Sequence, residues 1–347
     1  MAKFLDKEFF TFDDVLLVPR FCEITSRLDV SFKTRLTKNI YIDAPIISAN
    51  MDTITELEMM QAMHSLGCVG ILHRFMDLNK AFEQLGAFEH SPMCASIGVN
   101  EDSKNRFDVL LDCEVEVVCI DVAHGDSKTV LDMIEYCKQK SEKIQIIAGN
   151  VATPQATRRL INAGADAIKV GIGPGSLCTT RIVTGNGVPQ LSAIIECFNE
   201  ASFFRVPIIA DGGIRNSGDI VKALAAGAET VMIGSLLAGT SETPGEVIEE
   251  VEYYSSNPKK YKKYRGMASN DAMIGWKGRG YHAAPEGESK LVECKGPVEN
   301  IIKTLLSGIR SGMTYQGAKN IEELRNLATF IIVSNNSVIE NQPHGKM

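Results

Sequence analysis

The sequence predicts a TIM barrel, a closed (β/α)8 barrel, formed by residues 1–347 as a single domain. Short apolar runs rich in β-branched residues recur eight times along the chain, and helical patterns lie between them. Strands that alternate with helices are typical of a parallel sheet, and eight such units favour closure into a barrel. A doubly wound open sheet is the alternative, but no G-x-G-x-x-G opens a helix, which weakens it.

The strands are predicted from runs that are apolar at nearly every position. Parallel strands covered by helices are buried on both faces, so they lack the polar alternation of half-exposed strands. The predicted strands cover residues 45–48, 69–72, 95–99, 117–121, 144–148, 167–170, 207–210 and 230–233.

Helix boundaries can be read from capping residues. In the segment 153–164, Thr153 is a suitable N-cap, Pro154 occupies the first helical position, and Gly164 closes the helix. A second helix over 219–227 ends with Gly227 as its predicted C-cap, and a third covers 298–309. Residues ahead of the first strand are expected to cap the barrel.

Two connections are longer than the others. One is an inserted loop after the sixth strand, and the other is an excursion over residues 240–297 after the eighth. Long loops inside a compact domain are usually functional. Because the carboxyl ends of barrel strands carry the chemistry, these loops are the first place to search for a site.

Composition narrows the class of protein. The chain is 44% hydrophobic and carries a net charge of −7, so it can form a large core and lacks the basic surface expected of a nucleic-acid partner. Its nine cysteines form no C-x2-C pair, and Cys68, Cys94 and Cys119 lie in apolar runs. Without a signal-peptide core or an apolar run of about 18 residues, we expect a cytoplasmic protein with no membrane partner.

Cys178 is the candidate nucleophile. It lies in the loop at 171–181, after three glycines within five residues, and Arg181 follows three positions later. Backbone N–H groups and a nearby cation favour the thiolate, which is the reactive form of cysteine. An incidental cysteine in a flexible turn is the alternative, but the length of the loop and its place after a strand favour the nucleophile.

Glycine turns follow the seventh and eighth strands, at residues 211–215 and 234–236. In TIM barrels the turns after the seventh and eighth strands often bind phosphate through backbone N–H groups. Asp211 has the wrong charge for phosphate and suits sugar hydroxyls, so the two turns together predict a ribose-phosphate site. Tight turns of this kind need glycine in any case, so either turn alone is weak evidence.

Polar residues also end the second and fourth strands. We expect Asp121 to bind hydroxyls and His124 to be an ordinary turn residue, while Arg74 is equally compatible with a phosphate contact and a solvated charge. No H-E-x-x-H motif or carboxylate cluster predicts a metal site built from side chains.

The loop at 171–181 closely resembles the active-site loop of the IMP dehydrogenase/GMP reductase family. The segments 12–17, 48–53, 211–215 and 264–267 share the resemblance, which covers nearly the whole chain. It implies a TIM barrel, usually assembled as a homotetramer, in which a cysteine adds to C2 of a purine nucleotide. It also implies hydride transfer between that carbon and a nicotinamide.

The resemblance further implies roles for individual residues. Cys178 would be the nucleophile, and Thr180 with Glu286 would protonate the leaving group. Residues implied to bind the purine nucleotide are Ser48, Met51, Ser176, Asp211, Gly212, Gly213, Gly234, Ser235, Tyr264, Gly266, Met267, Ala268 and Gly287. Residues implied to bind the cofactor are Ser26, Arg27, Arg74, Asp121, Val122, Ala123, Ile172, Gly173, Ser311, Gly312, Met313 and Thr314. Backbone carbonyls implied to hold a monovalent cation, K+, are those of Gly173, Gly175, Cys178 and Arg181.

Within the family, the sequence is closest to GMP reductase, which converts GMP to IMP and ammonia with NADPH. After the second strand the chain continues through one short helix, without the regulatory module that dehydrogenases usually carry there. The segment 274–285 is short for a mobile flap, and its Arg279 and Tyr281 are not adjacent. Ser26, Arg27 and Asn50 also match the reductases.

Other segments resemble the dehydrogenases, namely residues 216–224 and 340–344. An IMP dehydrogenase without the regulatory module, which forms XMP with NAD, is therefore the alternative. A nucleotide-binding barrel without redox activity and a phosphate-binding isomerase or lyase are more remote. An isomerase or lyase would need a catalytic residue at a strand end, such as Lys169. We expect Lys169 to lie inside the barrel or to pair with Asp166.

Overall fold

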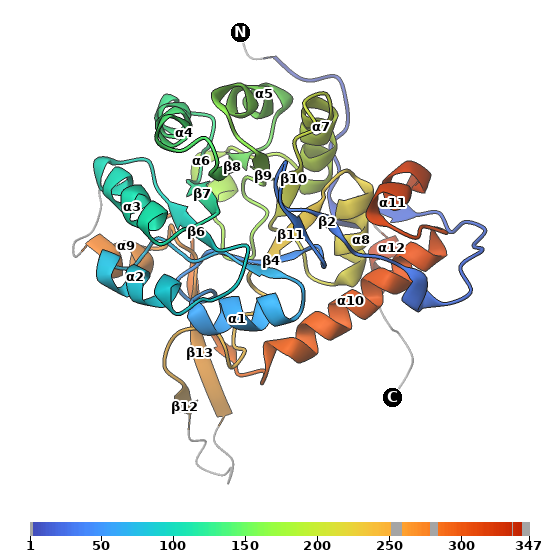
Figure 1. Ribbon diagram of the computed structural model, residues 1–347. Helices are drawn as coiled ribbons and strands as arrows, with labels where there is room; N and C mark the ends of the chain where they lie inside the picture. Colours follow the sequence, from blue (N-terminus) through green and yellow to red (C-terminus); the bar gives the residue numbers. More distant parts are fainter. Residues whose placement is uncertain (1–2, 251–258, 278–283, 335, 342–347) are drawn as a thin grey trace.

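All eight predicted strands are present and form one parallel sheet (Figure 1). The computed structural model describes residues 3–250, 259–277, 284–334 and 336–341. The strands are β4 (Ile46–Ser48), β5 (Val69–Gly70), β6 (Cys94–Ile97), β7 (Val117–Asp121), β8 (Gln145–Val151), β9 (Ala167–Val170), β10 (Ile208–Asp211) and β11 (Thr230–Ile233).

The sheet closes on itself. Its strand order is β5-β4-β11-β10-β9-β8-β7-β6, so β5 and β6 are the two edges. Leu72, just after β5, forms a parallel bridge with Ala95 on β6. Its N–H donates to the Cys94 carbonyl at 3.0 Å, and its carbonyl accepts from the Ser96 N–H at 2.8 Å. These bonds join the edges and exclude the open doubly wound sheet.

Helices surround the barrel. Those that follow the strands in order are α1 (Leu57–Ser65), α2 (Leu78–Gly86), α3 (Glu101–Asp112), α4 (Lys128–Lys140), α5 (Pro154–Ala163), α7 (Gln190–Ser202), α8 (Ser217–Ala225) and α10 (Val298–Tyr315). The predicted caps of α5 are confirmed, because the Thr153 side chain accepts from the Ala156 N–H and Gly164 is left-handed. Gly227 follows the Ala226 C-cap of α8 with a φ of +123°.

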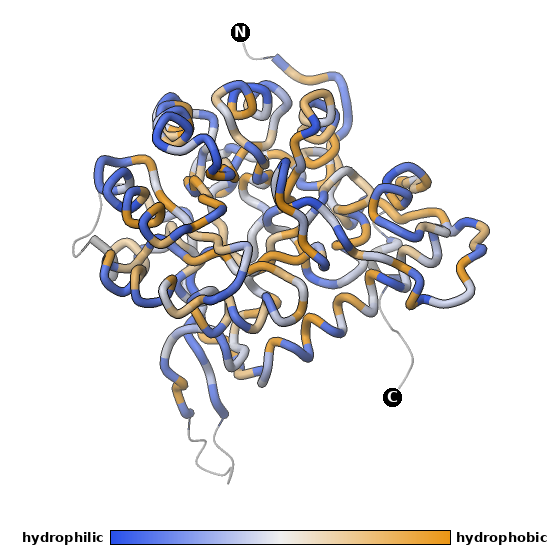
Figure 2. Tube along the Cα trace, in the orientation of Figure 1, coloured by the Kyte–Doolittle hydropathy of each residue, from blue (hydrophilic) through white to orange (hydrophobic). Residues whose placement is uncertain are grey.

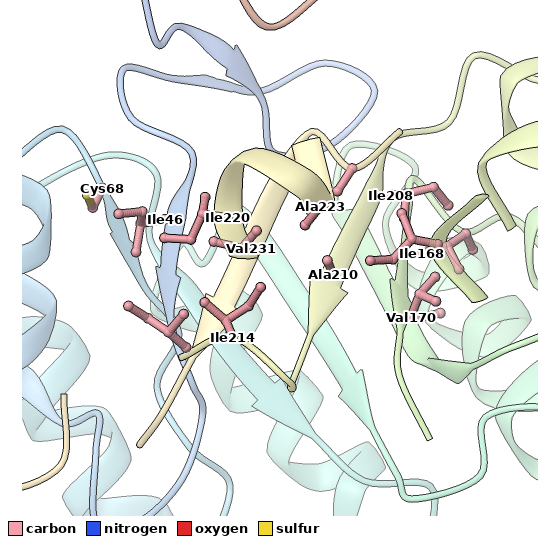
Figure 3. Packing of buried hydrophobic residues seen from close by; sticks show 14 of the residues in the cluster. Ile46, Cys68, Ile168, Val170, Ile208, Ala210, Ile214, Ile220, Ala223 and Val231 are labelled. Carbon is pink, nitrogen blue, oxygen red and sulfur yellow. The ribbon is translucent and has the colours of Figure 1, made fainter. Parts of the chain in front are cut away.

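The core has two layers, which explains the continuous apolar runs. Along β10, Ile208 packs outward against the helices and Ile209 points into the barrel. Ile46 and Ile47 on β4 divide in the same way. Figure 3 shows the outer layer, where Ile220 of α8 packs beside Val231 of β11. The helices are therefore apolar toward the barrel and polar on the outside (Figure 2).

The N-terminal segment covers one end of the barrel, as the sequence predicts. The hairpin of β2 (Thr34–Arg35) and β3 (Tyr41–Ile42) places Leu36 and Ile42 in the interior cluster. The other elements of this part and of the C-terminal part are η1 (Phe12–Asp14), β1 (Val15–Leu17), η2 (Arg27–Asp29), α11 (Ile321–Leu327), β15 (Phe330–Ile332) and α12 (Ser337–Glu340).

Both long connections contain structure that the sequence did not reveal. The loop after β9 includes a short helix, α6 (Thr180–Thr184). The excursion after β11 forms a three-stranded antiparallel sheet that projects from the barrel (Figure 1). The strands of this sheet are β12 (Ile248–Glu250), β13 (Lys259–Arg265) and β14 (Ser289–Glu293). The helix α9 (Asn270–Lys277) lies between β13 and β14 in the sequence. Helix α10 also continues beyond the predicted end at residue 309.

Cys68, Cys94 and Cys119 are buried in the core, as predicted, and all nine cysteines are free thiols. Within the described ranges, no helix is both long and apolar enough to span a bilayer.

Candidate active site

A cavity of about 320 Å³ opens at the carboxyl ends of the barrel strands. It brings together strand ends and loops from the whole length of the chain, including both long connections. The residues that line it are Ala49, Asn50, Met51, Arg74, Phe75, Asp121, Val122, Ala123, Asn150, Lys169, Gly171, Ile172, Gly173, Pro174, Gly175, Ser176, Leu177, Cys178, Thr180, Asp211, Gly212, Met232, Tyr264, Gly266, Met267, Ala268, Glu286 and Gly287.

Cys178 begins a chain of hydrogen bonds inside this cavity. Its thiol donates to Thr180 Oγ1 at 3.2 Å, and the Thr180 hydroxyl donates to Glu286 Oε2 at 2.7 Å. Thr180 and Glu286 lie 106 residues apart in the sequence. The arrangement connects a nucleophile to a carboxylate through one hydroxyl, which is a geometry for moving a proton between them.

Backbone pairing holds Glu286 in this position. Cys178 and Gly287 form an antiparallel bridge. The Thr179 N–H donates to the Glu286 carbonyl, and the Glu288 N–H donates to the Leu177 carbonyl, each at 2.9 Å. The excursion after β11 is thus attached to the cysteine loop residue by residue, so the hydrogen-bond chain does not depend on side-chain contacts alone.

Arg181 fixes the other side of the cysteine loop. Its guanidinium donates to the Ile172 carbonyl at 3.2 Å and to the Val188 carbonyl at 2.6 Å. Gly173 has a φ of +83°, and an added Cβ there would lie 2.5 Å from Arg181 Cγ. Only glycine allows the arginine to pack so closely against the loop, which closes the loop around Cys178.

The predicted monovalent-cation ligands lie in this same loop. The Gly175 carbonyl accepts from the Cys178 N–H, and the Arg181 carbonyl accepts from the Gly185 N–H. A carbonyl oxygen has two lone pairs, so each of these retains one for an ion, and an all-oxygen donor set suits a hard cation such as K+. Among the residues that the structure describes, no group of three His, Cys, Asp or Glu side chains could hold a metal ion.

The glycine turns predicted to bind phosphate converge at one point. Gly212, with a φ of +90°, lies so close to the cysteine loop that an added Cβ would be 3.1 Å from the Gly175 nitrogen. At Gly234 an added Cβ would be 3.3 Å from the Tyr264 hydroxyl. That hydroxyl is 3.4 Å from Ser176 Oγ. Burial raises the pKa of Tyr264, so its hydroxyl remains protonated.

Lys169 connects two acidic residues on the floor of the cavity. Its Nζ lies 2.9 Å from Asp121 Oδ1 and 2.7 Å from Asp211 Oδ2, and the lysine is buried. Burial opposes charge on Lys169 and Asp121, but the two carboxylates raise the pKa of Lys169 and the ammonium lowers the pKa of Asp121. Lys169 therefore lies inside the barrel, whereas Asp166 pairs with Lys138 at 2.6 Å.

Asp211 is held by one oxygen and leaves the other unused. Asp211 Oδ2 accepts from Lys169 and, at 2.9 Å, from the side-chain amide of Asn150. Within the described part of the chain, Asp211 Oδ1 has no hydrogen-bond partner, and the side chain is 21% exposed. This free oxygen can accept hydrogen bonds from the hydroxyls of a bound sugar.

The wall formed by residues 266–268 is secured to the loop after β4. Arg265 Nε donates to Asp52 Oδ2 at 3.0 Å. The Asp52 N–H donates to the sulfur of Met267 at 3.4 Å. The ion pair therefore fixes the part of the cavity that the sequence assigns to the nucleotide base.

Several predicted site residues do not line the cavity in this chain. Ser48 is completely buried and its hydroxyl accepts from Thr55 at 2.8 Å. Gly213, Gly234 and Ser235 are partly exposed but are not among the residues that line the cavity. Arg27 begins η2, which packs against α10, the helix that contains residues 311–314. The predicted cofactor residues thus fall into two groups, one in the cavity and one on the outside of the barrel.

The flap residues Arg279 and Tyr281 lie outside the described residues, as do positions 342–344 of the C-terminal tail. His124 is exposed and is not among the residues that line the cavity.

Sequence reasoning gave no site role to four polar or aromatic residues of the cavity, namely Asn50, Phe75, Asn150 and Lys169. Asn150 and Lys169 lie toward the carboxyl ends of β8 and β9, a position that could have identified them. Asn150 Oδ1 and Arg74 Nε are buried and have no hydrogen-bond partner among the described residues. Unpaired buried polar atoms beside a cavity are typical of a site that binds a polar ligand.

Comparison with known proteins identifies the family. The family model for the IMP dehydrogenase / GMP reductase domain matches residues 9–344, and the chain belongs to this family. It is 40% identical to inosine-5′-monophosphate dehydrogenase of Cryptosporidium parvum, over 96% of this chain and 94% of that protein. It is 37% identical to the enzyme of the same name from Borreliella burgdorferi, over 99% of this chain and 98% of that protein.

A solved structure gives a different name. The fold matches a crystal structure of a cysteine-to-alanine variant of Trypanosoma brucei GMP reductase in complex with guanosine 5′-monophosphate. The TM-score is 0.92, the sequences are 30% identical, and the match covers 98% of each chain. The protein is therefore an oxidoreductase of purine nucleotide metabolism with a TIM barrel, from a family that uses a nicotinamide dinucleotide.

Proposed function

We propose that this protein is a GMP reductase that converts GMP to IMP and ammonia with NADPH, through a covalent bond between Cys178 and C2 of the purine. The observation that carries the proposal is the continuous hydrogen-bond chain from the Cys178 thiol through Thr180 to Glu286. The overall reaction is GMP + NADPH + H+ → IMP + NH3 + NADP+.

The hydrogen-bond chain provides both proton movements that deamination needs. As Cys178 attacks C2, its proton passes to the Thr180 hydroxyl while the hydroxyl proton moves to Glu286. Ammonia is a poor leaving group until its nitrogen is protonated, so the same relay operates in reverse and returns a proton to the 2-amino group. The C2–N bond then breaks and leaves a thioimidate on Cys178, and a covalent path of this kind divides the reaction into two smaller barriers.

The rest of the nucleotide is positioned by residues around the cysteine. Asp211 accepts hydrogen bonds from the ribose hydroxyls with its free oxygen, while Lys169 and Asn150 hold the other oxygen. The phosphate occupies the convergence of the 174–176, 212–213 and 234–235 turns, beside Tyr264. Residues 266–268 and Gly287 cover the base.

Cofactor residues in the cavity are Arg74, Asp121, Val122, Ala123, Ile172 and Gly173. When bound, the nicotinamide would supply the hydride for C2 of the thioimidate. The C2–S bond then breaks, which releases IMP and returns Cys178 as the thiolate. Asp121 is fixed by Lys169, and Arg74 Nε is a buried donor without a partner among the described residues, so both are available to orient a polar ligand. K+ at the loop carbonyls would hold the backbone of the Cys178 loop and takes no part in the chemistry.

The second group of cofactor residues requires another subunit. Ser26, Arg27 and residues 311–314 lie on the outer side of the barrel, where η2 packs against α10, and not in the cavity. We propose that the chain is a single-domain barrel that assembles as a homotetramer, so that this group completes the cofactor site of a neighbouring copy. The oligomeric state in solution and loss of NADPH affinity in Arg27→Ala test this assignment.

The second candidate is IMP dehydrogenase, which forms XMP with NAD, and the names of the curated relatives favour it. Both reactions use the same cysteine, so the hydrogen-bond chain alone does not separate them. One assay of absorbance at the nicotinamide band separates the two reactions. We expect purified protein to consume NADPH in the presence of GMP and not to reduce NAD+ in the presence of IMP, and the reverse result identifies the dehydrogenase.

A further inference from the structure

A second cavity, of about 470 Å³, lies at the opposite end of the barrel, where the strands begin. It is enclosed by the β2–β3 hairpin, the end of α7 and the start of α11. Its walls include Pro207 and Glu229, which immediately precede β10 and β11. It is larger than the cavity around Cys178 and shares no lining residue with it.

The inner wall has an excess of positive charge. Glu229 is buried, and it accepts hydrogen bonds from the Thr34 hydroxyl and from Arg35 Nη2, each at 2.8 Å. Arg325 Nη2 also lies 3.4 Å from Glu229 Oε1. One carboxylate therefore faces two guanidinium groups, and one positive charge is left without a counterion in the wall.

Arg325 is poorly satisfied within the chain. Its Nε and Nη2 are buried and have no hydrogen-bond partner among the described residues. Its guanidinium stacks on the ring of Phe198, 4.8 Å from the centroid. Buried donors are nearly always hydrogen-bonded in native proteins. The Arg325 guanidinium, whose Nε has no partner within the described ranges and whose Nη2 has only the long ion pair with Glu229, can therefore take a further acceptor.

Two further cations lie at the mouth. The side chains of Lys33 and Arg205 are exposed and form no hydrogen bond or ion pair with any described residue. Arg205 has a left-handed backbone with a φ of +56°, which is uncommon for a residue other than glycine. Its carbonyl accepts from Arg35 Nη1 at 2.9 Å, which fixes this conformation at the mouth.

We propose that this cavity binds a small phosphate-bearing anion. Four cationic side chains line it, Lys33, Arg35, Arg205 and Arg325, against the carboxylates of Glu229 and Glu322. This excess matches the two charges of a phosphate monoester, although the whole chain has a net charge of −7. Arginine forks and a lysine point charge are the groups that bind phosphate best. The site is independent of the reaction proposed above.

The test is calorimetric titration of the full chain with inorganic pyrophosphate. The turns proposed to bind phosphate near Cys178 would also accept pyrophosphate, so the component that depends on the second cavity must be isolated by substitution. The double variant Lys33→Ser/Arg205→Gly removes both mouth cations. Glycine suits the left-handed backbone at position 205, so this variant should fold at least as well as the parent.

The matched control is Lys128→Ser/Lys303→Ser, which removes the same charge from exposed helix surfaces away from the cavity. We expect the parent and the control to bind pyrophosphate in the second cavity. In the Lys33→Ser/Arg205→Gly variant this binding should be absent or at least about tenfold weaker. Glu322→Gln, which removes a carboxylate at the mouth, should strengthen that binding. Identical isotherms for the parent and all variants, or a parent that shows no such binding, would overturn the proposal.

A crystal of the parent protein soaked in pyrophosphate provides the positional check. Density for the anion between Arg205 and Arg325 supports the proposal. Density confined to the cavity around Cys178, at a concentration that saturates the calorimetric signal, contradicts it.

Discussion

The two ends of the barrel are built from the same strands but hold their polar residues differently. At the carboxyl end, Asp211 has one oxygen fixed by Lys169 and Asn150 and one oxygen without a partner among the described residues. At the amino end, Glu229 uses both oxygens, one for Thr34 and one for Arg35. The first carboxylate is held ready for a ligand, and the second joins the N-terminal hairpin to the barrel.

This difference follows from what covers each end. A short hairpin covers the amino end, where Leu36 and Ile42 fill the barrel interior, and the cavity at this end lies between the hairpin, α7 and α11. Loops from distant parts of the chain surround the carboxyl end and leave a cavity between them. The comparison predicts that changes at the carboxyl end reduce turnover, whereas changes at the amino end reduce stability and spare the turnover of folded molecules.

Cys178→Ala should have the largest effect. Without the thiol no covalent bond to C2 forms, so turnover should fall by at least about 10⁴-fold, while GMP binding and the melting temperature stay close to those of the parent. NADPH consumption and calorimetric titration with GMP measure the two quantities. Cys294→Ala, a free cysteine outside the cavity, is the control, and retained activity in Cys178→Ala would remove the covalent mechanism.

Glu286→Gln should be the next most severe change. The amide still accepts a hydrogen bond from Thr180 but cannot take up a proton, so ammonia release should slow by about 10²–10⁴-fold. Hydride transfer, measured as the single-turnover formation of NADPH from IMP and NADP+ without ammonia, should be affected far less. Glu288→Gln, an exposed neighbour two residues away, should leave both steps unchanged. An unaffected deamination step in Glu286→Gln contradicts the relay.

Lys169→Met is the expected exception to this comparison, because Lys169 lies at the carboxyl end and yet its buried ion pairs stabilise the fold. It leaves Asp121 and Asp211 without their shared counterion, and removing one partner of a buried ion pair costs about 3–5 kcal/mol. Chemical denaturation should show this loss at pH 7. Lys138→Met, which breaks the more exposed pair with Asp166, should cost less.

The pH dependence of that loss provides a second check. Lys169 lowers the pKa of Asp121, so the pair stabilises the parent above the ordinary aspartate pKa of about 4 and loses this contribution as the pH falls through the lowered value. The stability difference between parent and Lys169→Met should therefore shrink below about pH 4. A difference that stays constant from pH 7 to pH 3 would show that packing, not charge, explains the loss.

Glu229→Gln tests the amino end and should have the smallest effect. Burial opposes ionisation of this carboxyl, but Arg325 and Arg35 more than offset it and lower its pKa. Loss of the charged hydrogen bond from Arg35 and of the ion pair with Arg325 should cost about 1–3 kcal/mol at pH 7, less below about pH 4, with unchanged kcat. Reduced kcat in fully folded Glu229→Gln would show that the two ends are coupled.

Local patterns were sufficient to predict much of the fold. The apolar runs identified all eight strands, because strands buried on both faces must be apolar at nearly every position. Thr153, Pro154 and Gly164 marked the ends of α5, since capping depends on residues that are adjacent in sequence. The glycine turns and the cysteine loop were visible for the same reason.

Contacts between distant residues were not predictable from local pattern. Local pattern leaves two positions open for Lys169, and only the closed barrel brings it between Asp121 and Asp211. The positions of Arg27 and residues 311–314 outside the cavity also required the folded chain. The sequence contains no short-range signal for such contacts, because they depend on how the loops cross the end of the barrel.

By itself, the sequence determined the strands and helices of the barrel, the cysteine loop and the resemblance to one enzyme family. These features are fixed by apolar periodicity, capping and local motifs, which act over a few residues. The tertiary structure decided that Glu286 reaches Thr180 across 106 residues and that a second, cationic cavity forms beneath the hairpin. Both depend on segments that meet only when the barrel closes and its loops pair.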